Sequence, residues 1–262
     1  MGWVKHTAIA LESRLRDCRN VLTLGVKANF SEYSREEQTL IRECPRIYYP
    51  TPFYAELFDV MGKPMFPSCQ TYRFAQDKIR QTALFSIIGI PHPRTRVYYG
   101  KRQHRRITAD FMFPFIAKIP RGSARGRGVF LIHNQMNLDQ YLEQSRVAYI
   151  QEYLPIQKDI RVVVIGNRVV HAYWRIAPAG DFRTNVAVGG RVSLDAVPEA
   201  ALELGLHAAG MCQWNDVGMD ICCCHDTWYV LEANMKYGKE GFRQAGLNYT
   251  AMMEDMIGNG DI

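Results

Sequence analysis

The feature that most constrains the fold is a pair of long apolar runs joined by Gly166-Asn167 in "DIRVVVIGNRVVHAYWRIA". A glycine–asparagine pair favours the tight turn between two antiparallel strands, and β-branched residues favour the strands themselves. The sequence therefore predicts a long β-hairpin at this point. A second hairpin is predicted from "VGMDICCC" to "WYVLEAN", with its turn at residues 225–227. With a helix at "EAALELGLHAAGMC", the two hairpins indicate an α+β lobe.

The first part of the chain instead alternates helical and strand patterns, which is typical of an α/β lobe. Residues 6–18 are predicted to be helical, and "VLTLGV" at residues 21–26 is predicted to form a strand. Ser34, with Glu37 three residues later, predicts a capped helix start. The helix that opens with "PFYAELFDVM" is expected to stop at Gly62.

These patterns divide the α/β protein into three units. Residues 1–75 are expected to form a compact lobe without an obvious first strand. Residues 76–148 are expected to form a strand-rich lobe with a glycine-rich loop, and residues 149–262 the α+β lobe. A helix is predicted over residues 73–89, and a strand at "RRITA", residues 105–109.

Composition is that of a soluble globular protein. The 262 residues are 47% hydrophobic and 22% charged, which is ordinary for an enzyme. No apolar run approaches the ~18 residues that span a bilayer, and the charged N-terminus does not resemble a secretory signal. Seven cysteines include no C-x-x-C pair, which favours reduced thiols. We expect a cytoplasmic protein without a membrane partner.

Positive charge is concentrated in one segment, although the net charge is only +6. Basic side chains crowd residues 94–127, where Asp110 is the single acidic residue. Such a segment suits an anionic partner, which would be a nucleotide phosphate, a nucleic acid or an acidic peptide. The alternative for Lys101–Arg106 is a solvated hairpin tip.

A glycine-rich loop follows a predicted strand in "KIPRGSARGRGVFLI". Glycines let backbone N–H groups approach phosphates, and Lys118 at the strand end adds a point charge. The lysine precedes the glycines and no helix follows them, so the loop matches neither the P-loop nor the dinucleotide fingerprint. A flexible hairpin is the alternative interpretation.

Polar residues stand beside buried strands at two further places. Asp159 and Arg161 share one face of a predicted strand, which indicates the edge of a polar pocket. In "GDFRTNVAVGG", Asp181, Arg183 and Asn185 share a face if the segment is extended. If the segment is a loop, those three side chains are solvated.

The second hairpin carries oxygen ligands on both of its strands. Glu232 and Asn234 lie two apart on one strand, and Asp220 lies on its partner. Carboxylate and carboxamide oxygens are the ligands of Mg²⁺, which also binds nucleotide phosphates. The alternative is that hydrogen bonds to Lys236 or Arg243 compensate these groups.

Taken together, these motifs resemble the ATP-grasp superfamily, and most of all its RimK-type group of ATP-dependent glutamate and peptide ligases. The resemblance runs from about Asp77 to the C-terminus. It is carried by "DK" at residues 77–78, "FIAK" with the glycine loop, "IQEYL", "DIRVVVIG", "GDFRTN" with "GG", and "GMDI" with "LEAN". The implied fold is an α/β ATP-grasp fold, with a small lobe over residues 76–148, a large lobe over 149–262 and a short N-terminal pre-ATP-grasp lobe.

The resemblance also implies roles for the site residues. The implied phosphate contacts are Lys78, Lys118 and the loop residues Gly122, Ser123, Gly126 and Gly128. The implied nucleotide contacts are Gln151, Glu152 and Tyr153 at the adenine, Asp159 at the ribose, and Arg161. Arg183 and Asn185 would act with Lys118 at the triphosphate and the reacting carboxylate. Asp220, Glu232 and Asn234 would hold Mg²⁺, as two ions, with Mn²⁺ as a substitute.

The implied activity is ATP-dependent formation of an amide from a carboxylate and an amine through an acyl phosphate. An amino acid such as glutamate would be added to a small molecule, peptide or protein. The alternatives are a non-catalytic ATP-binding protein and a nucleic-acid-binding protein. A homo-oligomer is one candidate assembly of the protein. After "LEAN" the chain has "MKYGKEGF" where the family has a Ser-Pro-Gly-like turn, so we expect a different amine substrate. Lys236, Lys239 and Arg243 favour an acidic one.

Overall fold

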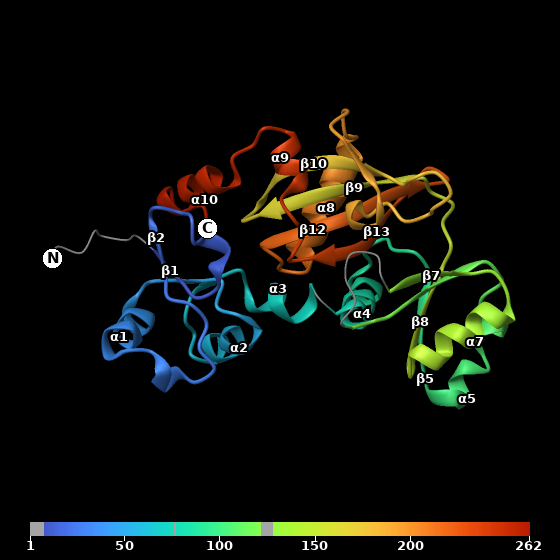
Figure 1. Ribbon diagram of the computed structural model, residues 1–262, viewed down its shortest axis with the longest axis horizontal. Coiled ribbons are helices and arrows are strands. Elements are labelled where there is room, and N and C mark those ends of the chain that lie inside the picture. The colour runs from blue at the N-terminus through green and yellow to red at the C-terminus, as the bar shows by residue number, and fades with distance from the viewer. Residues whose placement is uncertain (1–7, 76, 122–127) are drawn as a thin grey trace.

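The computed structural model describes residues 8–75, 77–121 and 128–262, which form three sheets in successive parts of the chain. Figure 1 shows the three parts as a blue lobe, a green lobe, and a yellow-to-red lobe built on the longest strands. They are called the first, second and third lobes below. This mixed arrangement of helices and separate sheets confirms the predicted α/β class.

The first lobe is built on four short parallel strands in the order β2-β1-β3-β4. Its elements are β1 (Ala8–Ala10), η1 (Ser13–Leu15), β2 (Val21–Thr23), η2 (Phe30–Glu32), α1 (Arg35–Glu43), β3 (Ile47–Tyr48), α2 (Pro52–Val60), β4 (Met65–Phe66) and α3 (Cys69–Phe74). Helix α1 begins as predicted, because the Ser34 hydroxyl accepts a hydrogen bond from the Glu37 amide at 3.1 Å.

The predicted helix over residues 6–18 is wrong within the described residues. Ala8–Ala10 is a strand, and only the short η1 is helical. All three residues of β1 are buried, because β1 is an internal strand of a parallel sheet. Such strands are continuously apolar, and short apolar runs cannot be told from a buried helix by periodicity. This strand is also the first strand that the sequence did not reveal.

The second lobe contains an antiparallel sheet in the order β5-β8-β6-β7. Its elements are α4 (Lys78–Ile88), β5 (Thr95–Tyr99), α5 (Gly100–His104), α6 (Ile107–Asp110), β6 (Phe115–Lys118), β7 (Val129–Ile132), α7 (Gln135–Gln144) and β8 (Val147–Glu152). The helix predicted over residues 73–89 is two helices, since Asp77 caps the start of α4. The strand predicted at "RRITA" is also wrong, because that segment contributes to α6.

Strand β8 spans the predicted boundary between residues 148 and 149. It pairs with β5 and β6 along its length, so the sheet of the second lobe continues to Glu152. Helix α4 lies between the lobes in Figure 1, and its Phe85 belongs to the hydrophobic core of the third lobe. The second and third lobes are therefore joined by packing as well as by the chain.

The third lobe contains a five-stranded antiparallel sheet in the order β11-β10-β9-β12-β13. Its elements are β9 (Lys158–Ile165), β10 (Arg168–Ile176), η3 (Val186–Val188), β11 (Arg191–Ser193), α8 (Glu199–Met211), β12 (Asp216–Cys224), β13 (Thr227–Asn234), α9 (Glu240–Gln244) and α10 (Tyr249–Gly258). Both predicted hairpins are confirmed, with turns at Gly166-Asn167 and at His225-Asp226.

Helix α8 covers one face of this sheet at close range. A Cβ atom on Gly205 would lie 2.8 Å from Val162, so glycine lets the helix approach β9. At 13 residues α8 is longer than the other helices that the structure describes. None of the described helices combines the length and the apolar character that crossing a bilayer requires.

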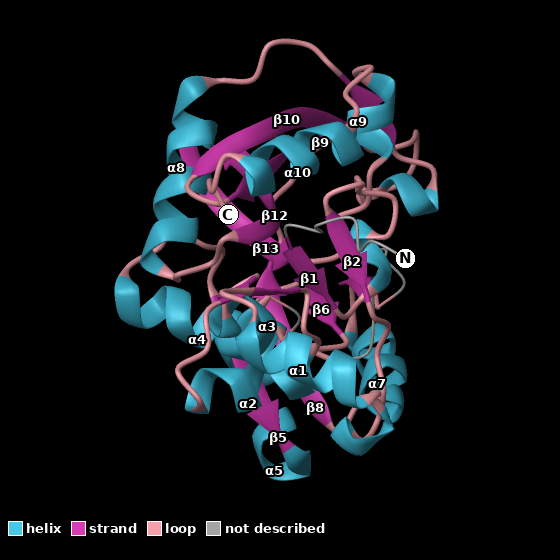
Figure 2. Cartoon of the chain, turned by 90° about the vertical axis from the view of Figure 1, so that its left-hand side faces the viewer, coloured by secondary structure: helices cyan, strands magenta, loops and turns pink. Residues whose placement is uncertain are grey.

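The C-terminal helix returns to the first lobe, as Figures 1 and 2 show. One hydrophobic core joins β1 to α10, with Ala10 packed in the same cluster as Met253 and Met256. In addition, the Tyr48 hydroxyl donates to the carbonyl of the last residue, Ile262, at 2.8 Å. The two ends of the described chain are therefore held together.

Candidate functional site

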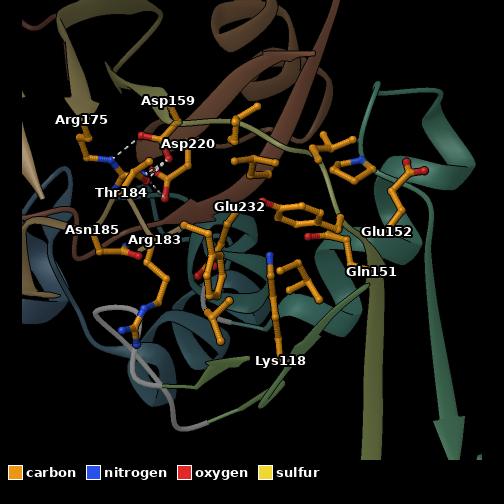
Figure 3. Close-up of a pocket in the computed structure, with 18 residues that line it drawn as sticks. Lys118, Gln151, Glu152, Asp159, Arg175, Arg183, Thr184, Asn185, Asp220 and Glu232 are labelled. Carbon is orange, nitrogen blue, oxygen red and sulfur yellow. Dashed lines mark hydrogen bonds and ion pairs between the residues drawn. The ribbon is translucent and has the colours of Figure 1, made fainter. Parts of the chain in front are cut away.

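Two adjoining cavities lie between the sheets of the second and third lobes. The first has a volume of about 110 Å³ and the second about 580 Å³. Both are lined by Val129, Arg175, Asn185 and Glu232. Figure 3 shows the residues that line the first cavity.

The first cavity is lined by both apolar and polar residues. The apolar residues that line it are Pro93, Ile116, Val129, Leu154, Ile156, Phe182 and Leu231. Polar groups stand at its edges, where β6, β8, β9 and β12 end or cross. An apolar slot with a few polar groups at its rim is the common form of a site for a flat heterocycle.

Gln151, Glu152 and Tyr153 line the first cavity at the end of β8, as the sequence predicts. The Gln151 side chain is buried and donates to the Thr95 hydroxyl at 2.9 Å. The Glu152 carboxylate accepts from the Arg94 amide, and Figure 3 places it at the far edge of the cavity.

Two lysines approach Glu232 from different elements. Lys78, the first residue of α4, places its Nζ 3.1 Å from Oε1 of Glu232. Lys118 ends β6 and is buried in the wall of the first cavity. Burial lowers the pKa of Lys118, and the negative charge of Glu232 opposes that shift. Cations whose counterion is shared in this way can receive a polyanion such as a triphosphate.

A buried network of two acids and two arginines contributes lining residues to both cavities. Arg175 donates to Asp159 at 2.8 Å and lies 2.8 Å from Asp220, which Arg161 contacts at 2.6 Å. Burial acts to raise the pKa of Asp220, but the two guanidinium groups outweigh it and hold that pKa below its usual value. Breaking one member would leave an uncompensated buried charge.

Asp159 is fully engaged within this network. Its two oxygens accept hydrogen bonds from Arg175 and from the Thr184 hydroxyl, which lies at 2.6 Å. The side chain is almost completely buried. Asp159 therefore fixes Arg175 and Thr184 in place, and its implied contact with a ribose stays a prediction.

The segment that carries Arg183 and Asn185 belongs to no strand of the sheet, although the backbone of Asn185 is extended. Arg183 nevertheless lines the first cavity and forms an ion pair with Asp181 at 2.7 Å. Asn185 lines both cavities. The loop folds back on itself at Gly190, where a Cβ atom would lie 2.2 Å from the Thr184 carbonyl oxygen. The glycine therefore allows the approach that positions Thr184.

The predicted metal ligands lie on adjacent strands. Asp220 is paired directly with Glu232, and Asn234 is paired with Gly218 at the next inward-facing position. Glu232 and Asn234 both line the second cavity. The described residues contain no cluster of three His, Cys, Asp or Glu side chains suited to a metal. Two carboxylates and one carboxamide are oxygen ligands of the kind that Mg²⁺ takes. Both oxygens of Asp220 are paired with Arg161 and Arg175 in this structure, so Asp220 would have to share them with the metal.

The negative charge of Glu232 is paired with a residue other than Lys236 or Arg243, the two partners considered from the sequence. Lys78 is that residue, whereas Arg243 is exposed and pairs with Glu240 at 2.6 Å. Among the basic residues after "LEAN", Lys236 lines the second cavity and Lys239 lies 4.2 Å from the Tyr249 ring.

The structure brings together most of the predicted site. The predicted residues that line the cavities are Lys78, Lys118, Gly128, Gln151, Glu152, Tyr153, Asp159, Arg161, Arg183, Asn185, Asp220, Glu232 and Asn234. The predictions for Gly122, Ser123 and Gly126 fall outside the described residues. Sequence reasoning missed Arg175 and Thr184. Thr184 stands between Arg183 and Asn185, which were singled out, whereas Arg175 lies on β10 and no local signal marks it.

Comparison with known proteins agrees with this geometry. Residues 75–257 match the RimK-like ATP-grasp domain family. The ribosomal protein bS6–L-glutamate ligase of Escherichia fergusonii is 30% identical over 216 residues, which are 76% of this chain and 70% of that one.

Solved structures share the fold at lower identity. A RimK domain ATP-grasp protein from Sphaerobacter thermophilus superposes with a TM-score of 0.70 at 16% identity, covering 95% of this chain and 98% of that one. The ATP-grasp ligase PsnB, solved with a precursor variant, Mg and ADP, has a TM-score of 0.69 at 19% identity, covering 98% and 99%. The chain therefore belongs to the RimK-like ATP-grasp family, a family of ATP-dependent ligases.

Proposed function

We propose that this ligase joins a carboxylate to an amine through an acyl phosphate, with ATP and Mg²⁺, and that it adds an amino acid such as glutamate to a peptide or protein. The observation that carries the proposal is the convergence of Lys78 and Lys118 on Glu232, opposite Asp220. Cations and oxygen ligands alternate there in the way that a metal-bound triphosphate requires.

We assign the adenine to the first cavity and the phosphates to the space between the two cavities. The apolar walls of the first cavity suit an adenine, and Gln151, Glu152 and Tyr153 border the same space. Lys78 and Lys118 then meet the phosphates, and the Lys78–Glu232 ion pair opens as the polyanion enters. Arg183 is paired with Asp181 in the loop. It would give up this ion pair to contact the terminal phosphate. Lys118 would remain at the wall and neutralise the same charge.

The reaction needs positioning and charge neutralisation more than a covalent catalyst. A substrate carboxylate oxygen attacks the γ-phosphorus, and the bond to ADP breaks as ADP leaves. The amine nitrogen then attacks the acyl carbon; the bond to phosphate breaks, phosphate leaves with the electron pair, and the nitrogen loses a proton. Mg²⁺ held by Asp220, Glu232 and Asn234 would supply charge neutralisation at the phosphates.

The second cavity is the proposed site of the two joined substrates. It shares Glu232 and Asn185 with the first cavity, so a molecule in it would lie beside the terminal phosphate. Lys236 adds positive charge there, which favours an acidic substrate. The Escherichia fergusonii relative is named for L-glutamate and a ribosomal protein, and PsnB was solved with a peptide precursor. These names support glutamate and a peptide or protein acceptor.

The proposal is tested with the full chain, Mg²⁺, ATP and glutamate, in the presence of a panel of synthetic peptides and ribosomal proteins. ADP release that depends on glutamate and one acceptor, with a matching mass increase of the acceptor, is expected. Glu232→Gln and Asp220→Asn should abolish both signals. Nucleotide binding without ADP release across the panel, or turnover that survives both substitutions, would overturn the proposal.

A further inference from the structure

Arg14 of the first lobe is held in an aromatic box and lines neither of the two cavities. Its guanidinium lies over the rings of Tyr237 at 4.7 Å, Tyr49 at 5.5 Å and Tyr249 at 5.5 Å. Its Nε donates to the Tyr249 hydroxyl at 3.1 Å. Three rings around one cation form a strongly attractive site, particularly where water is excluded.

The counterion of Arg14 is Asp216, the first residue of β12. Nε of Arg14 lies 3.9 Å from Oδ2 of Asp216, whose side chain is fully buried. The Asp216 carboxylate also accepts hydrogen bonds from Tyr49 at 2.9 Å and from Tyr237 at 2.7 Å. Each of these groups comes from a different part of the chain, so Asp216 gathers the first lobe and the segment after β13 around one point.

Tyr237 connects this cluster to the candidate site. Its phenol is fixed by Asp216, and its backbone carbonyl accepts from Nη1 of Arg161 at 2.8 Å. Arg161 in turn holds Asp220 at 2.6 Å. Between these two anchors, Tyr237 packs on Gly218, where a Cβ atom would lie 2.4 Å from that of Tyr237.

Three alternate residues of β12 explain why Tyr237 can contact both Asp216 and the strand beside Asp220. Asp216, Gly218 and Asp220 alternate along the strand, so all three face the same side of the sheet. Tyr237 lies across them, and with Lys236, Gly238 and Glu240 it forms one wall of the second cavity. This wall lies within "MKYGKEGF", the segment in which the chain departs from the family pattern.

We propose that Arg14 is a positioning residue, which acts through Asp216 and Tyr237 to fix residues 236–240 as the wall of the second cavity. The inference rests on the proposed function in assigning that cavity to the joined substrates. Loss of the Tyr237 hydroxyl should therefore loosen this wall and weaken binding of the amine substrate, while nucleotide binding in the first cavity remains unchanged.

The experiment compares Tyr237→Phe and Arg14→Lys with Tyr48→Phe in the full chain. Tyr48 is the matched control, because its hydroxyl also makes a buried hydrogen bond at 2.8 Å between the first lobe and the C-terminal part, but away from the cavities. Hydrogen exchange of the amides in residues 236–240 reports the wall, and the Kd of Mg²⁺ with a non-hydrolysable ATP analogue reports the first cavity.

Tyr237→Phe and Arg14→Lys should speed exchange in residues 236–240 by about five-fold or more, the effect of one lost buried hydrogen bond on a local opening equilibrium. Tyr48→Phe should leave that exchange unchanged, and all three should retain the analogue Kd. Equal exchange in Tyr237→Phe and Tyr48→Phe would overturn the proposal. Neither readout requires turnover, so this result is independent of the proposed ligase activity.

If the ligase reaction is observed, a second readout applies. Tyr237→Phe should raise KM for the acceptor peptide with little change in KM for ATP, whereas a general loss of stability would lower the active fraction and hence apparent kcat. A Tyr237→Phe variant with a reduced kcat and an unchanged acceptor KM would count against a positioning role.

Discussion

Asp220 lies directly opposite Glu232 in the ladder between β12 and β13, and an extra residue in β13 creates this pairing. Ile221 pairs with Val230, so Leu231 is left without a partner and the register shifts by one. Without that bulge, Asp220 would face Leu231. Bulges redirect side chains next to active sites, and this one brings two carboxylates together on the cavity side.

The first prediction concerns the Lys78–Glu232 ion pair that stands in front of this carboxylate pair. Lys78→Met should weaken binding of Mg²⁺ with an ATP analogue about ten-fold, because a charge-assisted phosphate contact is lost. Titration calorimetry measures the change. Lys27→Met, which removes a lysine from the Lys27–Glu37 pair of the first lobe, is the control and should bind normally. Equal affinities in the two variants would contradict the assignment of Lys78.

Structural features that depend only on neighbouring residues could be predicted from the sequence. The turn at Gly166-Asn167 and the cap at Ser34 rest on neighbouring residues, and both are confirmed. Strand β1 was missed because burial on both faces removes the periodicity that distinguishes strands from helices. Glu232 and Asn234 could be assigned to one face, and both line the second cavity, because their spacing along one strand is local.

The partners of the acidic residues of the site could not be predicted, because they depend on register and on distant packing. Counting back from the Gly166-Asn167 turn places Asp159 opposite Trp174. An extra residue at Val170 shifts the ladder, so that Asp159 faces Arg175 instead. The Lys78–Glu232 pair joins α4 to β13 across the cavity, which only the packing of the second lobe on the third determines.

The second prediction concerns Arg175, which serves Asp159 and Asp220 together. Arg175→Met should lower the free energy of unfolding by about 3–5 kcal/mol, because two buried carboxylates lose a partner. Urea denaturation measures this loss. Arg168→Met removes an exposed ion pair with Asp261 and should cost less than about 1 kcal/mol. A loss for Arg175→Met no larger than for this control would show that the network contributes little.

The third prediction concerns Gly190, which contacts the Thr184 carbonyl. Gly190→Ala should displace the loop, because its Cβ would lie 2.2 Å from that oxygen. We expect both a lower melting temperature and weaker binding of an ATP analogue, since Thr184 holds Asp159. Gly210→Ala is the control, as its Cβ meets no atom within 4 Å at the end of α8. That helical site should be neutral or gain up to about 1 kcal/mol.

The last prediction concerns pH and Lys118, whose pKa burial lowers from the usual 10.5. Phosphates favour the protonated lysine, so the Kd of an ATP analogue should be constant at lower pH. It should then rise by up to about ten-fold per pH unit once the free protein loses this proton.

Between the lowered pKa and 10.5 the unfolded chain binds more protons at this residue than the folded chain. The contribution of Lys118 to stability therefore increases with pH, while nucleotide affinity decreases over the same range. Lys118→Met should bind the analogue weakly at every pH. In this variant, neither the affinity nor the Lys118 contribution to stability should vary with pH, as titrations from neutral to about pH 10 would reveal. An equal slope of log Kd against pH in the variant and the native protein would assign the titration to another group.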